Sequence, residues 1–124
     1  MNPIARIALL LGFVSAALAQ SAPANIGDTA KGKALVDAKG MTLYTYDRDT
    51  AGRSTCSGVC LTNWPAFEAP AEAKAAGEWT IIERADGKRQ WAHKGQALYR
   101  WKDDKKPGDA TGDGVNNVWR IARP

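Results

Sequence analysis

Two cysteines, one histidine and several aspartates are the side chains with which this chain could do chemistry. Cys56 and Cys60 are its only cysteines. In an exported protein such a pair is expected to form a disulfide, and closing so small a loop contributes only about 2 kcal/mol in chain-entropy terms. The spacing differs from the Cys-x-x-Cys of thioredoxin-like centres and from the Cys-x-x-Cys-His of c-type haem attachment. A structural disulfide is therefore predicted, with a labile or redox-active disulfide and metal thiolates as alternatives.

His93 is the single histidine. A metal or haem site there would need partners such as Met41, Cys60 or a carboxylate, and no spacing in the sequence brings these together. No serine or cysteine nucleophile stands in the context of an elbow or a triad. The simplest interpretation is a partly exposed strand histidine, and no cofactor is predicted.

Asp49 and Asp104 occupy matching positions in two copies of one sequence pattern. The simplest role for a repeated aspartate just past a strand is to accept backbone N–H bonds in the turn that follows. A second hypothesis is an enzyme acting on cell-wall or secreted substrates, for which the two carboxylates would have to lie within several ångströms of each other.

The segment Asp109-x-Thr111-x-Asp113-Gly114 resembles the first half of a calcium loop, with oxygen ligands at alternate positions. Its second half does not fit, because Arg120 stands where an EF-hand has its bidentate glutamate. Asp109 and Asp113 are therefore, like His93, only weak metal candidates, and a solvated connection is the favoured interpretation.

The elements that would position these side chains come from a duplicated pattern, Lys-Gly-x-x-Leu-Tyr-x-aromatic-x-x-Asp, whose two copies are related by one constant offset. A fixed period indicates that one supersecondary unit is used twice and that the core forms between the copies. The copies are Lys39, Gly40, Leu43, Tyr44, Tyr46 and Asp49, and then Lys94, Gly95, Leu98, Tyr99, Trp101 and Asp104.

Strand signals dominate the chain around these copies. Asp86-Gly87 between the β-prone runs 79–84 and 89–93 predicts a tight hairpin, and further strands are expected at 34–37, 43–47, 63–67, 97–102 and 117–122. A short helix is expected at 69–76, between Pro70 and Gly77. The predicted fold is mainly β: a duplicated antiparallel meander, with repeats at about 34–68 and 79–122, packed as a small sandwich or barrel, with the one short helix between the repeats.

Tyr44-x-Tyr46-x-x-Asp49 and Tyr99-x-Trp101-x-x-Asp104 both fit a Tyr-x-aromatic-x-x-Asp signature. On these residues the chain resembles the bacterial secreted-repeat family described as predicted lipoproteins with a Yx(FWY)xxD motif. The segment from Cys56 to Pro65 and the segment from Gly108 to Trp119 are also similar to elements of that family. The resemblance spans about residues 34–122 and implies no activity, because the family has no established biochemical function.

Residues 1–19 have the features of a secretory signal peptide: Arg6, an apolar stretch at 7–18 and a small-x-small site before Gln20. The apolar stretch is shorter than the roughly 20 residues that span a bilayer. Gln20 stands where many members of the family carry a lipoprotein cysteine. We therefore expect cleavage near Ala19 and a periplasmic or secreted protein without a membrane span or lipid anchor, in which a flexible arm (20–33) precedes a single domain (34–124).

The 17 basic and 13 acidic residues give a net charge of +4 and are interspersed, which argues against a nucleic-acid binder. Most aromatic residues are expected to fill a thin core, although an open face would make a stacking platform for a sugar, a haem-like ring or a peptide; Tyr44, Tyr99 and Trp101 are the candidates. The sequence thus predicts a non-enzymatic β domain that binds a small molecule or an envelope protein. The alternative is a redox or metal/haem accessory protein that uses Cys56 and Cys60 or His93.

Overall fold

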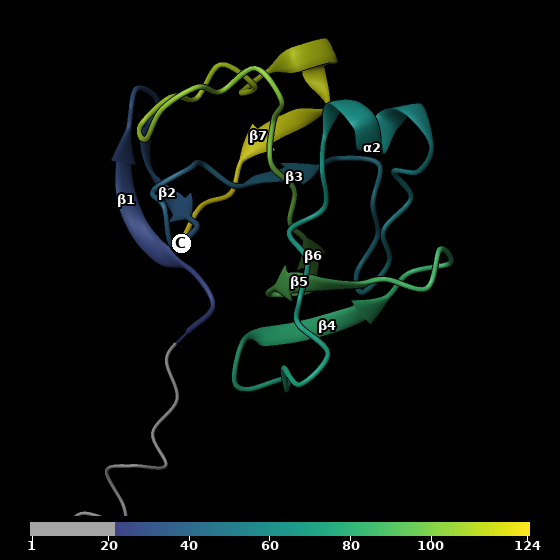
Figure 1. Ribbon diagram of the computed structural model, residues 1–124. Helices are drawn as coiled ribbons and strands as arrows, with labels where there is room; N and C mark the ends of the chain where they lie inside the picture. Colours follow the sequence, from purple (N-terminus) through teal and green to yellow (C-terminus); the bar gives the residue numbers. More distant parts are fainter. Residues whose placement is uncertain (1–21) are drawn as a thin grey trace, which may run out of the picture.

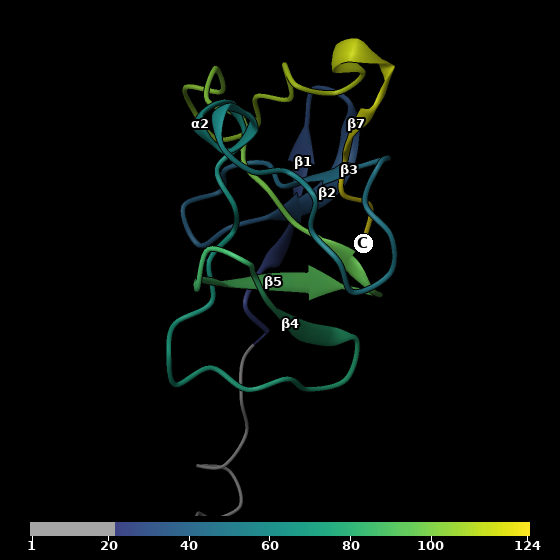
Figure 2. The ribbon, with the colours of Figure 1, turned by 90° about the vertical axis from the view of Figure 1, so that its right-hand side faces the viewer.

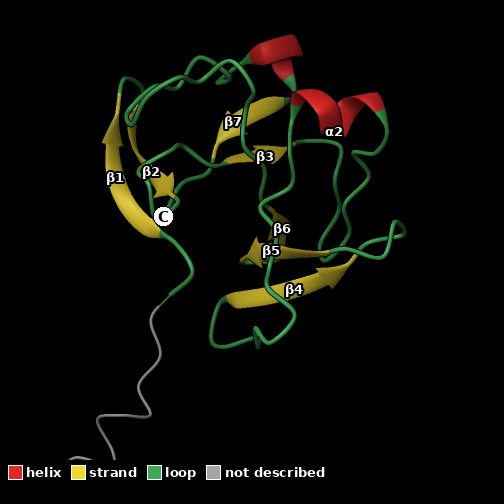
Figure 3. Ribbon diagram, viewed as in Figure 1, coloured by secondary structure: helices red, strands yellow, loops and turns green. Residues whose placement is uncertain are grey.

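The computed structural model describes residues 22–124. The expected signal peptide (1–19) and the start of the expected arm (20 and 21) lie outside the described residues. The described chain is mainly β, as predicted, and its strand pairs are antiparallel (Figures 1 and 3). In chain order the elements are β1 (Asn25–Thr29), β2 (Gly32–Val36), β3 (Tyr44–Tyr46), α2 (Val59–Asn63), β4 (Trp79–Glu83), β5 (Arg89–His93), β6 (Gln96–Ala97), η2 (Val115–Asn117) and β7 (Trp119–Ile121).

The β1–β2 hairpin shows that the expected flexible arm was wrong for residues 25–33. The turn of this hairpin is closed by the Thr29 hydroxyl, which donates to the Gly32 carbonyl and accepts from the Lys31 N–H. β1 is mostly exposed, whereas the end of β2 is buried. The polar composition of β1 is therefore that of an exposed edge strand, which composition alone does not distinguish from a loose segment.

An approximate two-fold relation between the repeats passes between Tyr44 and Tyr99. The backbones of these two residues exchange N–H···O bonds of 2.8 and 3.0 Å. On its other side Tyr44 pairs with Ile121, and Tyr99 pairs with Ala66. The two sides are equivalent, because the offset that carries Tyr44 onto Tyr99 also carries Ala66 onto Ile121. Each repeat thus places its closing segment against the other repeat.

The same exchange continues at the ends of both closing segments. The Trp91 N–H donates to the Phe67 carbonyl at 2.9 Å, and the Leu35 N–H donates to the Ala122 carbonyl at 2.8 Å. Within residues 22–124 the strands form short sheets, β1–β2, β3–β7 and β4–β5–β6, and do not close into a barrel. The β4–β5 hairpin lies at the opposite end of the molecule from α2 and η2 (Figures 1 and 2).

Within residues 22–124 one short α-helix is present, but it lies at Val59–Asn63 and not at 69–76. The segment 69–76 consists of turns and loop, and its carbonyl groups at Pro70, Ala71 and Ala73 accept hydrogen bonds from the Arg89 guanidinium. In a helix these carbonyl groups would accept intrahelical bonds, so the bonds from Arg89 take the place of a helix here. The strand expected at 63–67 is likewise reduced, since its first residue ends α2 and Ala66 forms an isolated bridge.

Four aromatic rings stack in a row between the repeats, and we call this row the aromatic ladder. Trp64 and Trp119, at equivalent positions in the two repeats, are parallel within 3° with centroids 3.8 Å apart. Trp101 stacks on Trp64 at 4.0 Å and Tyr46 stacks on Trp119 at 4.2 Å. Because Tyr46 and Trp101 are also equivalent positions of the repeated pattern, the ladder obeys the two-fold relation. It fills the core between the copies.

The ladder requires a residue without a side chain at position 112. A Cβ on Gly112 would lie 2.8 Å from Trp64 and 3.0 Å from Trp101, closer than packed atoms approach. We expect Gly112→Ala to lower the free energy of unfolding by about 1–3 kcal/mol, the usual cost of overpacking a core. Urea unfolding followed by tryptophan fluorescence measures this. The exposed variant Lys105→Ala on the same loop should change stability by less than about 0.5 kcal/mol, and an equally mild Gly112→Ala would contradict the close approach.

Candidate functional site

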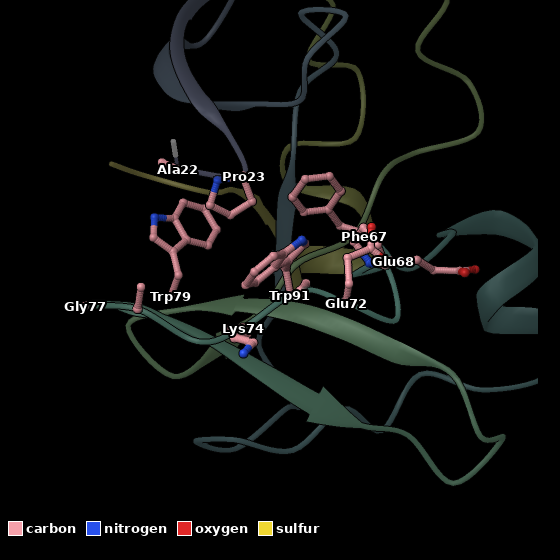
Figure 4. A pocket seen from close by; sticks show the side chains of 12 residues that line it. Ala22, Pro23, Phe67, Glu68, Glu72, Lys74, Gly77, Trp79 and Trp91 are labelled. Atoms are coloured by element: carbon pink, nitrogen blue, oxygen red, sulfur yellow. The ribbon is translucent and has the colours of Figure 1, made fainter. Parts of the chain in front are cut away.

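A groove of about 750 Å³ opens beside the β4–β5 hairpin, a volume in the range of small-molecule sites. We call it the aromatic groove, because Phe67, Trp79 and Trp91 line it (Figure 4). The loop 70–77 and residues 22 and 23 complete its walls. Strands β4 and β5, paired from Trp79–His93 to Glu83–Arg89, position the two tryptophans.

The two tryptophans form an open corner. Their ring centroids are 6.1 Å apart and the ring planes meet at 83°. Trp91 is largely buried at the floor, whereas Trp79 is half exposed. The Arg100 guanidinium lies 5.2 Å from the centroid of the Phe67 ring. Neither indole N–H donates to a described residue, and no polar side-chain atom in the described chain is buried without a partner. Both N–H groups can therefore donate to a ligand.

Charged residues stand at the rim of the aromatic groove. Glu68, Glu72 and Lys74 line it, and within residues 22–124 none of them makes an ion pair. Arg89 holds the loop that carries Glu72 and Lys74, since its guanidinium bonds to three loop carbonyls and lies 3.2 Å from Glu83. The rim therefore presents charges to solvent from a fixed loop.

Sequence reasoning did not single out the residues of the aromatic groove. Phe67, Trp79 and Trp91 lie outside the repeated motif. A comparison of the two copies could have found them, because the residues at these positions differ between the copies. At the equivalent positions of the other copy the chain has smaller residues: Ala122, Ala24 and Val36. Both repeats supply the same backbone scaffold. At each of these three pairs of equivalent positions, however, only one repeat carries a large aromatic ring.

Tyr44 and Tyr99, two of the predicted stacking residues, cannot stack on a ligand, because both are 0 % exposed. The prediction was wrong because their strands lie at the centre of the domain and not at an open face. The third candidate, Trp101, is half-buried, with Trp64 stacked on it and the Lys102 ammonium 5.7 Å from its ring centroid.

The tyrosines and aspartates of the motif bond across the two repeats. The Tyr44 hydroxyl donates to Asp104 at 2.6 Å, and the Tyr99 hydroxyl donates to Asp49 at 2.7 Å. Burial, and then the bond to Asp104, raises the pKa of Tyr44 far above its usual range, and burial together with Asp49 raises the pKa of Tyr99 in the same way. Both tyrosines are therefore fixed as neutral donors.

Each aspartate also closes the loop that follows it. Asp49 Oδ1 accepts from the N–H and the hydroxyl of Thr55, and Asp104 Oδ1 accepts from the same two groups of Thr111. All four aspartate oxygens thus have a partner. The motif ties each loop to the opposite repeat, and its carboxylates point into their own turns and not toward a shared site.

Cys56 and Cys60 form a disulfide with their Cα atoms 5.3 Å apart. Cys56 is 1 % exposed, and its carbonyl accepts a 2.8 Å hydrogen bond from Arg84. The buried Arg84 guanidinium also donates to Ser54 and Gln90. The disulfide therefore sits on a buried polar network and closes the turn that begins α2.

His93 packs beside Trp79, which forms one wall of the groove corner. Its ring centroid is 4.6 Å from that of Trp79, and its Nε2 lies 3.6 Å from Glu78. Burial lowers the pKa of His93, which Glu78 only partly offsets and which the nearby Lys94 reinforces. The imidazole is therefore neutral near pH 7.

The two aspartates of the calcium-like segment bind the chain itself. Asp109 accepts from the N–H groups of Lys105 and Lys106, and these bonds lower the pKa of its carboxyl. Asp113 accepts from the Ile121 N–H at 3.0 Å. Among residues 22–124 no group of three or more His, Cys, Asp or Glu side chains is placed to hold a metal ion.

A family model described as a secreted repeat of unknown function matches residues 25–68 and again residues 80–123. The chain belongs to this family. No curated protein and no solved structure matched it. The two matches of the secreted repeat coincide with the structural duplication, because one begins with β1 and the other within β4. None of the helices described for this secreted-repeat protein is long and apolar enough to cross a membrane.

The two cross-repeat bonds can be compared within one molecule. We expect Tyr44→Phe to lower the free energy of unfolding by about 1.5–3 kcal/mol, because it leaves Oδ2 of the buried Asp104 without its donor and the Gly112 N–H without its 3.1 Å acceptor. Tyr99→Phe should cost less, since Asp49 is half exposed and water can replace the hydroxyl. Urea unfolding of both variants measures the difference. A larger loss for Tyr99→Phe would contradict this comparison.

The pKa of His93 makes stability depend on pH. Because this pKa is lowered on folding, the unfolded chain takes up the proton first, at about pH 6.5, and the stabilising contribution of neutral His93 is lost as the pH falls below that value. We expect the melting temperature to fall between about pH 7.5 and pH 5, and to fall less in His93→Gln. Calorimetry across this range tests the assignment, and identical profiles for the two proteins would refute it.

Proposed function

We propose that this secreted-repeat protein is a non-enzymatic binding module, and that its aromatic groove takes a small molecule with a flat apolar face. The observation that carries the proposal is the open corner of Trp79 and Trp91 in a groove of about 750 Å³. Indole rings bury a large apolar area and favour stacked or edge-on contact with another ring. A planar ligand would find two such surfaces at right angles.

The polar groups of the groove favour orientation of a ligand and not its conversion. Glu68, Glu72 and Lys74 stand at the rim, where their charges are screened by water and salt. The nearest histidine, His93, is engaged with Trp79 and Glu78. We therefore infer binding without catalysis, in which the indole N–H groups and the rim charges fix the orientation of the ligand.

We further propose that the protein acts in the periplasm or outside the cell after cleavage near Ala19. The secreted-repeat family supports export, and a disulfide such as Cys56–Cys60 persists in an oxidising compartment. The redox or metal alternative finds less support in the described residues. Cys56 is buried, and neither it nor Cys60 has a histidine or carboxylate pair placed to hold a metal with it.

A fluorescent probe tests the aromatic groove. N-phenyl-1-naphthylamine, a neutral aromatic molecule with flat rings, should bind at one saturable site and gain fluorescence. Trp79→Ala removes one wall of the corner and should weaken binding about tenfold or more, the effect of losing one large stacking surface. Ala76 is exposed and lines the groove. Ala76→Phe would place a ring in the space that the probe occupies and should therefore weaken probe binding.

The control is Ile26→Ala, which removes another exposed apolar side chain, outside the lining of the groove. It should leave probe binding unchanged. Saturable binding that survives both Trp79→Ala and Ala76→Phe, with thermal melts showing folded proteins, would refute the site. Capture of an envelope protein that Ala76→Phe blocks, with no binding of the probe, would show that the groove serves a protein partner and refute the small-molecule proposal.

A further inference from the structure

The two ends of the aromatic ladder are equivalent in the repeat but differ in their surroundings. At one end the Lys102 ammonium lies near the Trp101 ring, and the Gly112 backbone packs so closely that a Cβ would lie 3.0 Å from it. At the other end Tyr46 borders an open groove of about 340 Å³, which we call the ladder groove. The two ends thus differ in what lies beside them: Lys102 and Gly112 at Trp101, and a groove at Tyr46.

Three polar side chains line the ladder groove beside Tyr46: Arg48, Asn63 and Asn116. Within residues 22–124 no hydrogen bond or ion pair engages their side-chain nitrogens, and no polar side-chain atom is buried without a partner. Arg48 and Asn116 are exposed and Asn63 is half-buried, so their donors and acceptors are accessible to solvent beside the groove. By contrast the nearby Arg120 is held by three bonds to Asp47, of 3.5, 3.1 and 2.8 Å.

The backbone at Asn116 fixes one of these amides on the rim. Asn116 and Asn117 both have positive φ, 51° and 58°, a conformation that asparagine tolerates better than most residues. The Gly114 N–H donates to the Trp119 carbonyl at 2.7 Å and anchors the turn to β7. The amide is thus presented from a defined turn above the ladder.

The charge of the ladder groove is positive. Arg48 is the charged residue of its lining, and Asp103 stands at the equivalent position of the second repeat. A guanidinium without a protein partner matches a carboxylate, to which it can donate two parallel bonds. The amides of Asn63 and Asn116 can each donate and accept, which suits hydroxyl and acetamido groups. The half-buried Tyr46 ring offers an apolar face.

We propose that the ladder groove binds a saccharide that carries a carboxylate. The apolar face of a sugar ring would lie against Tyr46, its hydroxyl or acetamido groups would bond to the amides, and its carboxylate would bond to Arg48. Val59, 77 % exposed at the start of α2, supplies an apolar edge for a methyl group. This site lies at the α2 and η2 end of the molecule, so it is independent of the aromatic groove.

Two saccharides of this class serve as probes: trigalacturonic acid and N-acetylmuramic acid. In titrations followed by NMR of the backbone amides, at least one should shift the signals around Asn63 and Asn116 saturably. Its methyl ester, which lacks the charge, should bind about tenfold more weakly, as expected for the loss of a charge-assisted bond. Arg48→Gln should weaken binding of the acid by a similar factor and leave binding of the ester unchanged.

Asn116→Gly tests the side-chain amide without disturbing the turn, because glycine keeps the positive φ while removing the side chain. It should weaken binding of the acid and of the ester alike. Arg53→Gln makes the same charge change as Arg48→Gln at an exposed arginine outside the lining, and should have no effect. The proposal is overturned if neither acid binds at millimolar concentration, if acid and ester bind equally, or if Arg53→Gln weakens binding as much as Arg48→Gln.

Discussion

The exchange of backbone hydrogen bonds between Tyr44 and Tyr99 is the constraint on which the rest of this structure depends. It joins the repeats at their two-fold relation, and the tyrosine hydroxyls of the same two residues extend the exchange to the aspartates of the opposite copy. Every loop that these aspartates close is therefore positioned by the other half of the chain. Neither repeat has a core of its own, because the aromatic ladder is built from both.

The duplication separates what the fold needs from what distinguishes its surfaces. The ladder and the tyrosine–aspartate bonds occur in both copies, as expected of parts that hold the domain together. The aromatic groove and the ladder groove depend on positions where the copies differ. Trp91 is equivalent to Val36 in the other repeat, and Arg48 is equivalent to Asp103. Because the two halves share one scaffold, the positions at which they diverge give each groove a lining that the equivalent surface of the other half lacks.

Much of the fold followed from local sequence, and most of the candidate site did not. The Asp86-Gly87 turn predicted the β4–β5 hairpin because the turn geometry is encoded by the residues themselves. The helix expected at 69–76 was overridden by a tertiary contact, the bonds from Arg89 to its carbonyls. Tyr44 was misjudged because period-2 alternation assigns residues to a face of a strand but does not tell which face is covered. The aromatic groove is lined by segments that are distant in the sequence, and no local sequence pattern indicates that these segments meet.

The exchanged closing segments also govern the order in which the chain can fold. β3 finds its partner in β7, and the Leu35 N–H finds its acceptor at Ala122, in the closing segment of the second repeat. The first repeat therefore cannot complete its hydrogen bonds until the final strand is present. Such long-range pairing slows folding. A chain that emerges from its amino end could form the β1–β2 and β4–β5 hairpins early, but it would join its two repeats only once residues 119–122 had emerged.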